Sequence, residues 1–152
     1  MANVFDVAKY ILRSIGEVST MKLQKLCYYS QALSLSEKHK HLFEEDFEAW
    51  SNGPVCRDLF NIHKGKFLIT TKNIQNNLLS KSLTIEQTSI IDEIIDKLGK
   101  LEGYQLSEKS HNEDPWIKTR NGKPIGEFCN KVIKKTLIEE LYNKDLIFKF
   151  DE

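Results

Sequence analysis

Apolar residues in the first forty positions recur with the period of an α-helix. One apolar stripe runs through residues 3–15 and stops at Gly16, a residue type that often follows a helix. Ser19 or Thr20 can cap a second helix over residues 21–38, which carries two apolar stripes. Two stripes predict a central helix that is packed on both sides, with its tyrosines in the core or at its rim.

The pattern changes in the next thirty residues. Apolar and polar residues alternate over residues 47–52, which favours a short extended segment. An Asn-Gly pair then predicts a turn, and Pro54 fits the first position of a new helix over residues 54–64. Residues 66–73 are rich in β-branched types and favour either a second short strand or an ordered connection.

The second half of the chain returns to helical spacing. Residues 72–83, rich in Asn, Ser and Lys, predict a loop. Thr84 and Gln87 then form a capping-box pattern that begins a helix over residues 85–100. Residues 103–111 favour a short helix.

The C-terminal part is predicted from turn residues and one long apolar pattern. Asp114 can cap a turn that Pro115 opens. A last strong helix is expected over residues 126–143, and residues 145–152 alternate and favour a small final strand. The core side of that last helix would consist of Phe128, Val132, Ile133, Leu137 and Leu141.

These elements predict a mainly α fold: a single compact helical domain over residues 1–152, with about six helices and one or two short strands. A chain of 152 residues suits one domain and can bury about 70% of the surface that its unfolded form exposes. No segment has the composition of a linker.

Charge, hydropathy and cysteine content argue against a nucleic-acid-binding, membrane-spanning or secreted protein. Lys plus Arg and Asp plus Glu both number 22, so the basic excess typical of nucleic-acid binders is absent. No apolar window approaches the roughly 18 residues of a membrane span, and no signal peptide is expected. Three well-separated cysteines indicate reduced thiols in a cytoplasmic protein.

The sequence offers little catalytic chemistry. The four histidines and three cysteines show no zinc-ligand spacing, and no cofactor motif occurs. Cys56 and His63 would lie about 10 Å apart along a helix, too far for a hydrogen bond. His111 with Glu113 or Asp114 is an acid–base cluster in principle, although Asp114 is explained more simply as a cap. We therefore expect no catalytic residue, metal or cofactor.

Three motifs in order resemble a known family. They are "MKLQKLCYYSQALSL", "LFEEDFEAWSNGPVCRDLF" and, some sixty residues on, "LSEKSHNEDPW". Their order and spacing resemble the Panacea domain family, the SocA-like (also GepA-like) antitoxin domains of bacteria and phages, over roughly residues 5–118. The matching residues are Leu23, Gln24, Lys25, Leu26, Tyr28, Tyr29, Ala49, Trp50, Gly53, Pro54, Val55, Leu106, Ser107, His111, Asp114, Pro115 and Trp116.

The resemblance implies a mostly α-helical, non-enzymatic domain that neutralises a cognate toxin by direct protein contact. Members of the family neutralise diverse toxins, many of which act on translation. The toxin that this protein neutralises would be encoded by an adjacent gene. The family supplies no catalytic residue to transfer.

We interpret the motif residues as scaffold. Trp50 and Trp116 are expected to be buried in the interior, where they fix the helices against one another. Burial of about 150–250 Å² by one indole would contribute at most roughly 4–6 kcal/mol to the stability of the fold. Partner contacts are then expected on residues outside the motifs. The candidates are the loop from Lys72 to Lys81 and exposed positions of the last helix: Lys131, Lys134 and Lys135.

Other functions stay open at this point. The protein would alternatively be a proteolytic adaptor that presents a bound protein to a protease. It would also fit a transcriptional autoregulator, for which "KVIKK" is the one modest basic run. A small hydrolase built on His111 is the least favoured alternative.

Overall fold

The computed structural model describes residues 2–74 and 82–150. Within these ranges the chain is mainly α-helical, which confirms the predicted fold class. Its eight α-helices are α1 (Val4–Ile15), α2 (Thr20–Lys38), α3 (Arg57–His63), α4 (Ile85–Leu98), α5 (Gly103–His111), α6 (Asp114–Arg120), α7 (Lys135–Leu141) and α8 (Lys144–Phe148). A 3₁₀ turn, η1, covers Thr71–Asn73.

Five short strands form two small antiparallel sheets in the described residues. They are β1 (Val18–Ser19), β2 (Phe47–Trp50), β3 (Gly53–Cys56), β4 (Leu68–Ile69) and β5 (Val132–Ile133). Strands β2 and β3 form a hairpin in which Trp50 faces Gly53 across the turn. Strand β5 pairs with the other side of β2, and β1 pairs with β4.

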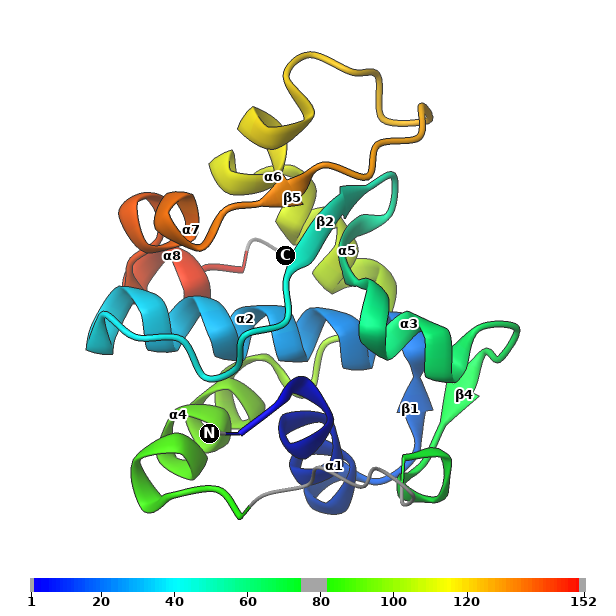
Figure 1. Ribbon diagram of the computed structural model, residues 1–152, viewed down its shortest axis with the longest axis vertical. Coiled ribbons are helices and arrows are strands. Elements are labelled where there is room, and N and C mark those ends of the chain that lie inside the picture. Colours follow the sequence, from blue (N-terminus) through cyan, green and yellow to red (C-terminus); the bar gives the residue numbers. More distant parts are fainter. Residues whose placement is uncertain (1, 75–81, 151–152) are drawn as a thin grey trace.

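Helix α2 runs through the middle of the molecule (Figure 1). Helices α1 and α4 pack on one side of it, and β3, α5, α7 and α8 contact it on the other. Every residue from Leu23 to Leu35 is consequently buried. The two apolar stripes therefore identified the central helix correctly, and Tyr28 and Tyr29 lie in the core as expected.

Local capping explains where several helices begin. The Ser19 hydroxyl accepts a hydrogen bond from the Lys22 amide at the start of α2. Thr84 and Gln87 exchange hydrogen bonds at the start of α4, as the capping box predicts. Because these contacts are local in sequence, the helix starts were predictable from the pattern alone.

Pro54 does not open a helix, contrary to the prediction. It lies in β3 opposite Ala49, and α3 begins only at Arg57. The reason is that Gln24 of α2 binds both the amide and the carbonyl of Cys56, which holds this segment extended.

The predicted helix over residues 126–143 is also wrong over its first half. Val132 and Ile133 form β5, and the helix is confined to Lys135–Leu141. Phe128 and Val132 are exposed rather than on a core side. The buried Arg120 guanidinium binds the Glu127 carbonyl, which a helix beginning at residue 126 would need for its own hydrogen bonds.

Two further predictions near the C-terminal half require correction. The tail forms the short helix α8 and not a strand, because Asn143 caps it through the Leu146 amide. Glu113, and not Asp114, occupies the N-cap position of α6, and Asp114 is an exposed first-turn residue.

The two tryptophans, both expected in the interior, differ in burial. Trp116 is buried as expected, whereas Trp50 is only partly buried.

Candidate functional site

The backbone of the β2–β3 hairpin is held by side chains of the central helix. Gln24 donates from its amide nitrogen to the Cys56 carbonyl (3.1 Å) and accepts from the Cys56 amide (2.8 Å). Lys25 donates to the carbonyl of Pro54 (3.1 Å). Both side chains are almost fully buried, at 2% and 1% exposure, so these bonds lie in a region without competing water.

Helices α5 and α6 hold the same hairpin from the other direction. The bonds are Ser107 Oγ to the Asn52 carbonyl (2.6 Å), Trp116 Nε1 to the Trp50 carbonyl (2.8 Å) and Arg120 Nη1 to the Ala49 carbonyl (2.8 Å). Five side chains from three helices thus fix one short hairpin. Four of these five side chains, all except Arg120, belong to the resembling motifs.

Gly53 sits at the closest approach between the hairpin and the helices beneath it. Its backbone has φ of +107°, and a Cβ added there would lie 2.7 Å from both Lys25 Cε and Ser110 Oγ. We expect Gly53→Ala to lower the free energy of unfolding by about 2–4 kcal/mol, through backbone strain together with this overlap. Urea denaturation measures the loss.

Gly122 supplies a matched control for that substitution. It also has a positive φ, +86°, but a Cβ there meets nothing within 4 Å. Gly122→Ala is therefore expected to cost only the backbone strain, about 1 kcal/mol. Equal losses in the two variants would contradict the close approach at Gly53.

Beside the hairpin lies a depression that we call the aromatic hollow. Its volume is about 400 Å³, and its apolar lining residues are Met21, Trp50, Val55, Phe60 and Phe128. The Trp50 ring lies 4.9 Å from that of Phe60 and 6.1 Å from that of Phe128. The buried side chains of Gln24, Lys25 and His63 lie at its base.

The orientation of the Trp50 indole is fixed by an ion pair at its edge. Its Nε1 donates to Glu48 Oε1 (2.8 Å), and Arg57 binds the same carboxylate (2.9 Å) while lying over the indole face. Burial on its own would raise the pKa of Glu48, but the hydrogen bonds from Arg57 and Trp50 together with the charge of Arg57 outweigh it and lower that pKa. The carboxylate therefore stays charged and the indole stays in place at neutral pH.

The base of the hollow is basic. Burial lowers the pKa of Lys25 to about 7. Burial also lowers the pKa of His63, and the neighbouring charge of Lys25 lowers it further. No aspartate or glutamate is among the described residues that line the hollow.

The family model described as "Antitoxin SocA-like, Panacea domain" matches residues 23–117. The chain belongs to this family. The matched range runs from the buried part of α2 to α6 and contains four of the five side chains that clamp the hairpin. The resemblance seen in the motifs is thus confirmed.

A curated relative agrees with the family match. The Panacea domain is similar to antitoxin SocA of Caulobacter vibrioides, with 29% identity over 133 aligned residues, covering 77% of this chain and 70% of the relative. No solved structure matches the chain significantly.

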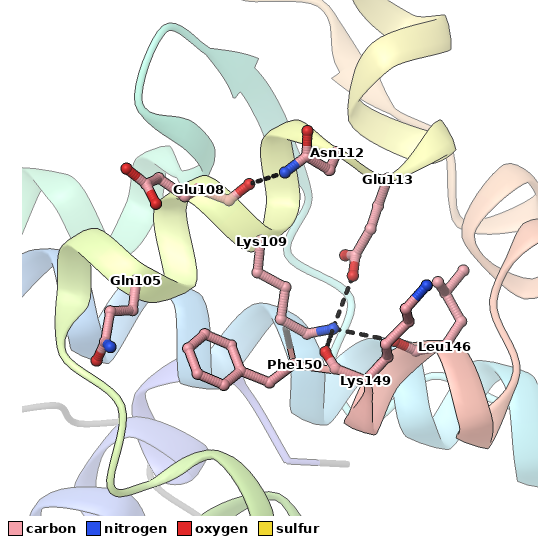
Figure 2. A pocket seen from close by; sticks show the side chains of 8 residues that line it. All are labelled: Gln105, Glu108, Lys109, Asn112, Glu113, Leu146, Lys149 and Phe150. Atoms are coloured by element: carbon pink, nitrogen blue, oxygen red, sulfur yellow. Dashed lines mark hydrogen bonds and ion pairs between the residues drawn. The ribbon is translucent and has the colours of Figure 1, made fainter. Parts of the chain in front are cut away.

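A second polar cluster of the Panacea domain surrounds Lys109, and Figure 2 shows it beside a small pocket of about 170 Å³. The Lys109 ammonium binds Glu113 Oε2 (2.7 Å) and the carbonyls of Leu146 (2.9 Å) and Lys149 (2.6 Å). These bonds join α5 to the end of α8. The ammonium thus has three partners within the chain.

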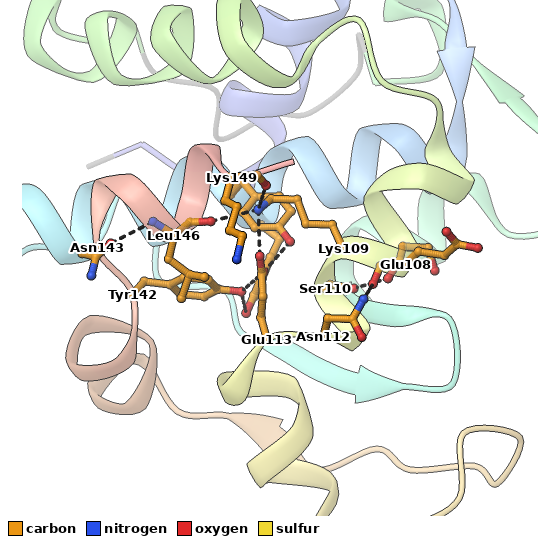
Figure 3. A network of polar contacts seen from close by, with 12 residues as sticks. Glu108, Lys109, Ser110, Asn112, Glu113, Tyr142, Asn143, Leu146 and Lys149 are labelled. Atoms are coloured by element: carbon orange, nitrogen blue, oxygen red, sulfur yellow. Dashed lines mark hydrogen bonds and ion pairs between the residues drawn. The ribbon is translucent and has the colours of Figure 1, made fainter. Parts of the chain in front are cut away.

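Two tyrosines complete this cluster, and Figure 3 shows one of them, Tyr142, beside the Glu113 carboxylate. Tyr29 and Tyr142 donate to Glu113 Oε1, at 2.6 and 2.7 Å. Burial raises the pKa of both phenols, so they remain protonated donors. Both oxygens of Glu113 are therefore used, and we interpret the cluster as structural. The i,i+4 spacing of Lys109 and Glu113 was its one signal in the sequence.

The catalytic alternatives find no support in this geometry. The His111 ring lies against Trp116, with centroids 4.3 Å apart, while the Glu113 carboxylate is bound elsewhere. Burial raises the pKa of the Cys56 thiol to about 12, so it is not a thiolate near His63. In the part of the chain that the structure describes, no three potential ligands are grouped to hold a metal ion.

The lysines expected to contact a partner have different surroundings. Lys131 and Lys134 are exposed and line a shallow groove beside Val132. The ammonium of Lys135 instead binds Asp46. Lys72 is exposed in η1, and Lys81 lies outside the described residues.

No helix among the residues described is long and apolar enough to cross a membrane.

Proposed function

We propose that this protein neutralises a cognate toxin by binding it directly, and that the aromatic hollow is the centre of the contact. Membership of an antitoxin family supports the general role. The observation that carries the finer proposal is the partly exposed aromatic cluster of Trp50, Phe60 and Phe128 beside a clamped hairpin. The partner is a protein encoded by an adjacent gene.

Rigidity makes this surface suited to binding. Aromatic residues carry a large share of the energy in protein interfaces, particularly near the centre of the contact. Phe128 is 60% exposed and Ile125 on the same loop is equally exposed, so both have apolar surface left to bury. Because the hairpin is already fixed by five side chains, little conformational freedom remains to be lost on association.

The exposed lysines fit a peripheral role in the same interface. Lys131 and Lys134 follow Phe128 in sequence and line a groove next to β5. Charges at the rim of an interface mainly raise the association rate and contribute little to the final affinity. We infer that residues 1–152 act as one binding domain, since Lys109 ties the C-terminal helix back to α5.

Phe128→Ala tests the contact. The wild-type protein is expected to restore growth when it is expressed together with the product of the adjacent toxic gene. Phe128→Ala should weaken binding of that toxin by about 5–30-fold, because it removes exposed aromatic surface from the centre of the interface. The measurement is titration calorimetry with the purified toxin, or with an inactive toxin variant.

Ile85→Ala is the control, because Ile85 is 86% exposed at the start of α4, on the opposite side of α2. It should bind like the wild type. Unchanged affinity of a folded Phe128→Ala variant would refute the placement of the interface. The cellular toxin level is followed in parallel, since a level that falls on co-expression would favour degradation over occlusion.

A further inference from the structure

Lys25 at the base of the aromatic hollow is a buried amine without a carboxylate partner. It is 1% exposed, and its one hydrogen-bond partner within the described residues is the carbonyl of Pro54. Lys109, which is also buried, has Glu113 at 2.7 Å and two further carbonyls as partners. Lys25 therefore lacks the counter-ion that Lys109 has in the described residues.

The titratable groups closest to Lys25 on neighbouring elements are two histidines. The charge of Lys25 lowers the pKa of His63 of α3 and of His111 of α5, while Arg120 lowers and Glu108 raises the pKa of His111. The nearby Glu48 is already bound by Arg57 and by the Trp50 indole. The hollow is therefore electrostatically complementary to an anionic group brought in from outside.

We propose that the hollow receives an acidic side chain of the toxin, whose carboxylate pairs with Lys25 while the apolar residues beside it pack on Trp50 and Phe128. This assignment rests on the proposed function, since it names the chemistry of the partner at the same surface. The toxin segment is thus an aspartate or glutamate next to apolar residues.

The composition of the hollow favours a carboxylate over a phosphate. Its lining contains one lysine and no arginine, so it offers one cationic group for one negative charge. Phosphate sites in proteins usually present arginine forks or several donors. The apolar walls also suit a protein segment, whose neighbouring side chains can cover the aromatic rings.

Pairing of this kind changes the protonation of Lys25. With a pKa of about 7, the amine is mostly neutral at pH 8 in the free protein. A carboxylate at hydrogen-bond distance favours the charged form, so association at pH 8 should take up about 0.9 proton per complex. Calorimetry in two buffers of different ionisation enthalpy measures this uptake in the wild-type protein without any substitution.

Lys25→Met removes the amine and retains an unbranched apolar side chain of similar length. We expect it to weaken toxin binding by about 10–100-fold and to abolish the proton uptake. Lys38→Met is the control, since Lys38 is exposed at the far end of α2, about 20 Å from Lys25 along the helix. Its affinity and proton uptake should match the wild type.

A double-mutant cycle identifies the partner group. Each aspartate and glutamate of the toxin is replaced by the corresponding amide, and one of these changes should weaken binding to the wild type but not to Lys25→Met. Thermal unfolding confirms that the variants are folded.

Three results would overturn the assignment: wild-type binding without proton uptake, full affinity of Lys25→Met, or coupling to the toxin's terminal carboxylate in place of a side chain. Toxin binding by the wild type that is unaffected by Lys25→Met leaves the proposed function standing and removes only this inference. Absence of any wild-type binding removes both.

Discussion

Replacement of Glu113 by alanine is expected to lower the free energy of unfolding by about 3–5 kcal/mol. The Glu113 carboxylate is 5% exposed and binds Lys109, Tyr29 and Tyr142 at 2.6–2.7 Å. Its removal leaves a buried ammonium without a counter-ion and two buried hydroxyls without their acceptor. An uncompensated buried charge is among the most costly defects that a substitution can create.

Urea denaturation followed by tryptophan fluorescence measures this loss. Glu127→Ala is the matched control, because Glu127 also pairs with a lysine at i,i+4, but at 3.9 Å and on the surface. That exposed pair should contribute less than about 0.5 kcal/mol. A double variant, Lys109→Met with Glu113→Gln, should recover part of the stability, since it removes the charge as well as its partner. A Glu113→Ala variant as stable as the Glu127→Ala control would show that the cluster is not structural.

The helices α1, α2 and α4 were predictable because their causes are local. Periodic apolar residues define which face is buried, and capping residues within three positions of each start define where the helix begins. The two stripes of α2 even indicated its central position. These features depend on neighbours in sequence, which a pattern displays directly.

The hairpin and the C-terminal segment were predicted wrongly because their causes are distant. Pro54 lies in a strand since Gln24, thirty-two residues before Cys56, binds that residue's amide and carbonyl. The helix predicted over residues 126–143 does not begin at residue 126, since the Glu127 carbonyl binds Arg120. A proline after a turn and an apolar period both favour helices locally, and only the tertiary contacts reverse that preference.

The candidate site was predictable in part. The motif residues include four of the five side chains that clamp the hairpin, but their pattern showed neither the hairpin nor the partial exposure of Trp50. Phe60 and Phe128 come from separate segments, and Phe128 was expected in the core. The periodicity of an apolar run does not distinguish a core residue from an exposed one when the run is not helical.

One short stretch of α2 supports both the hollow and the buried charge cluster. Gln24 and Lys25 reach the hairpin, and Tyr29, one helical turn after Lys25, reaches Glu113. The two polar sites therefore share one rigid element. Loss of stability in the Glu113 cluster and loss of binding at the hollow are nonetheless separable, because the first alters the free energy of unfolding and the second alters affinity in a folded protein.

Arg120→Ala is expected to produce the second large effect, with a loss of about 3–5 kcal/mol in the free energy of unfolding and a loss of toxin binding. The buried guanidinium, 2% exposed, donates to the carbonyls of Ala49, Pro124 and Glu127 and lies over the Trp116 ring. It therefore joins the hairpin to the loop that carries Phe128. Without it these carbonyls lose a buried donor, and Phe128 loses its fixed position beside Trp50.

Two substitutions separate the roles of Arg120. Arg120→Lys keeps the charge but not the planar fork that binds several carbonyls, so its stability should lie between those of the wild type and Arg120→Ala. Arg13→Ala, at an exposed position of α1, should have a free energy of unfolding within about 0.5 kcal/mol of that of the wild type.

The salt dependence gives a further test. Because the wild-type Arg120 binds backbone carbonyls and not a carboxylate, the destabilisation caused by Arg120→Ala should persist at high salt, which screens only interactions between charges. A loss that disappears in 1 M salt, or toxin affinity that survives Arg120→Ala in a folded protein, would contradict the role of this residue in positioning the aromatic hollow.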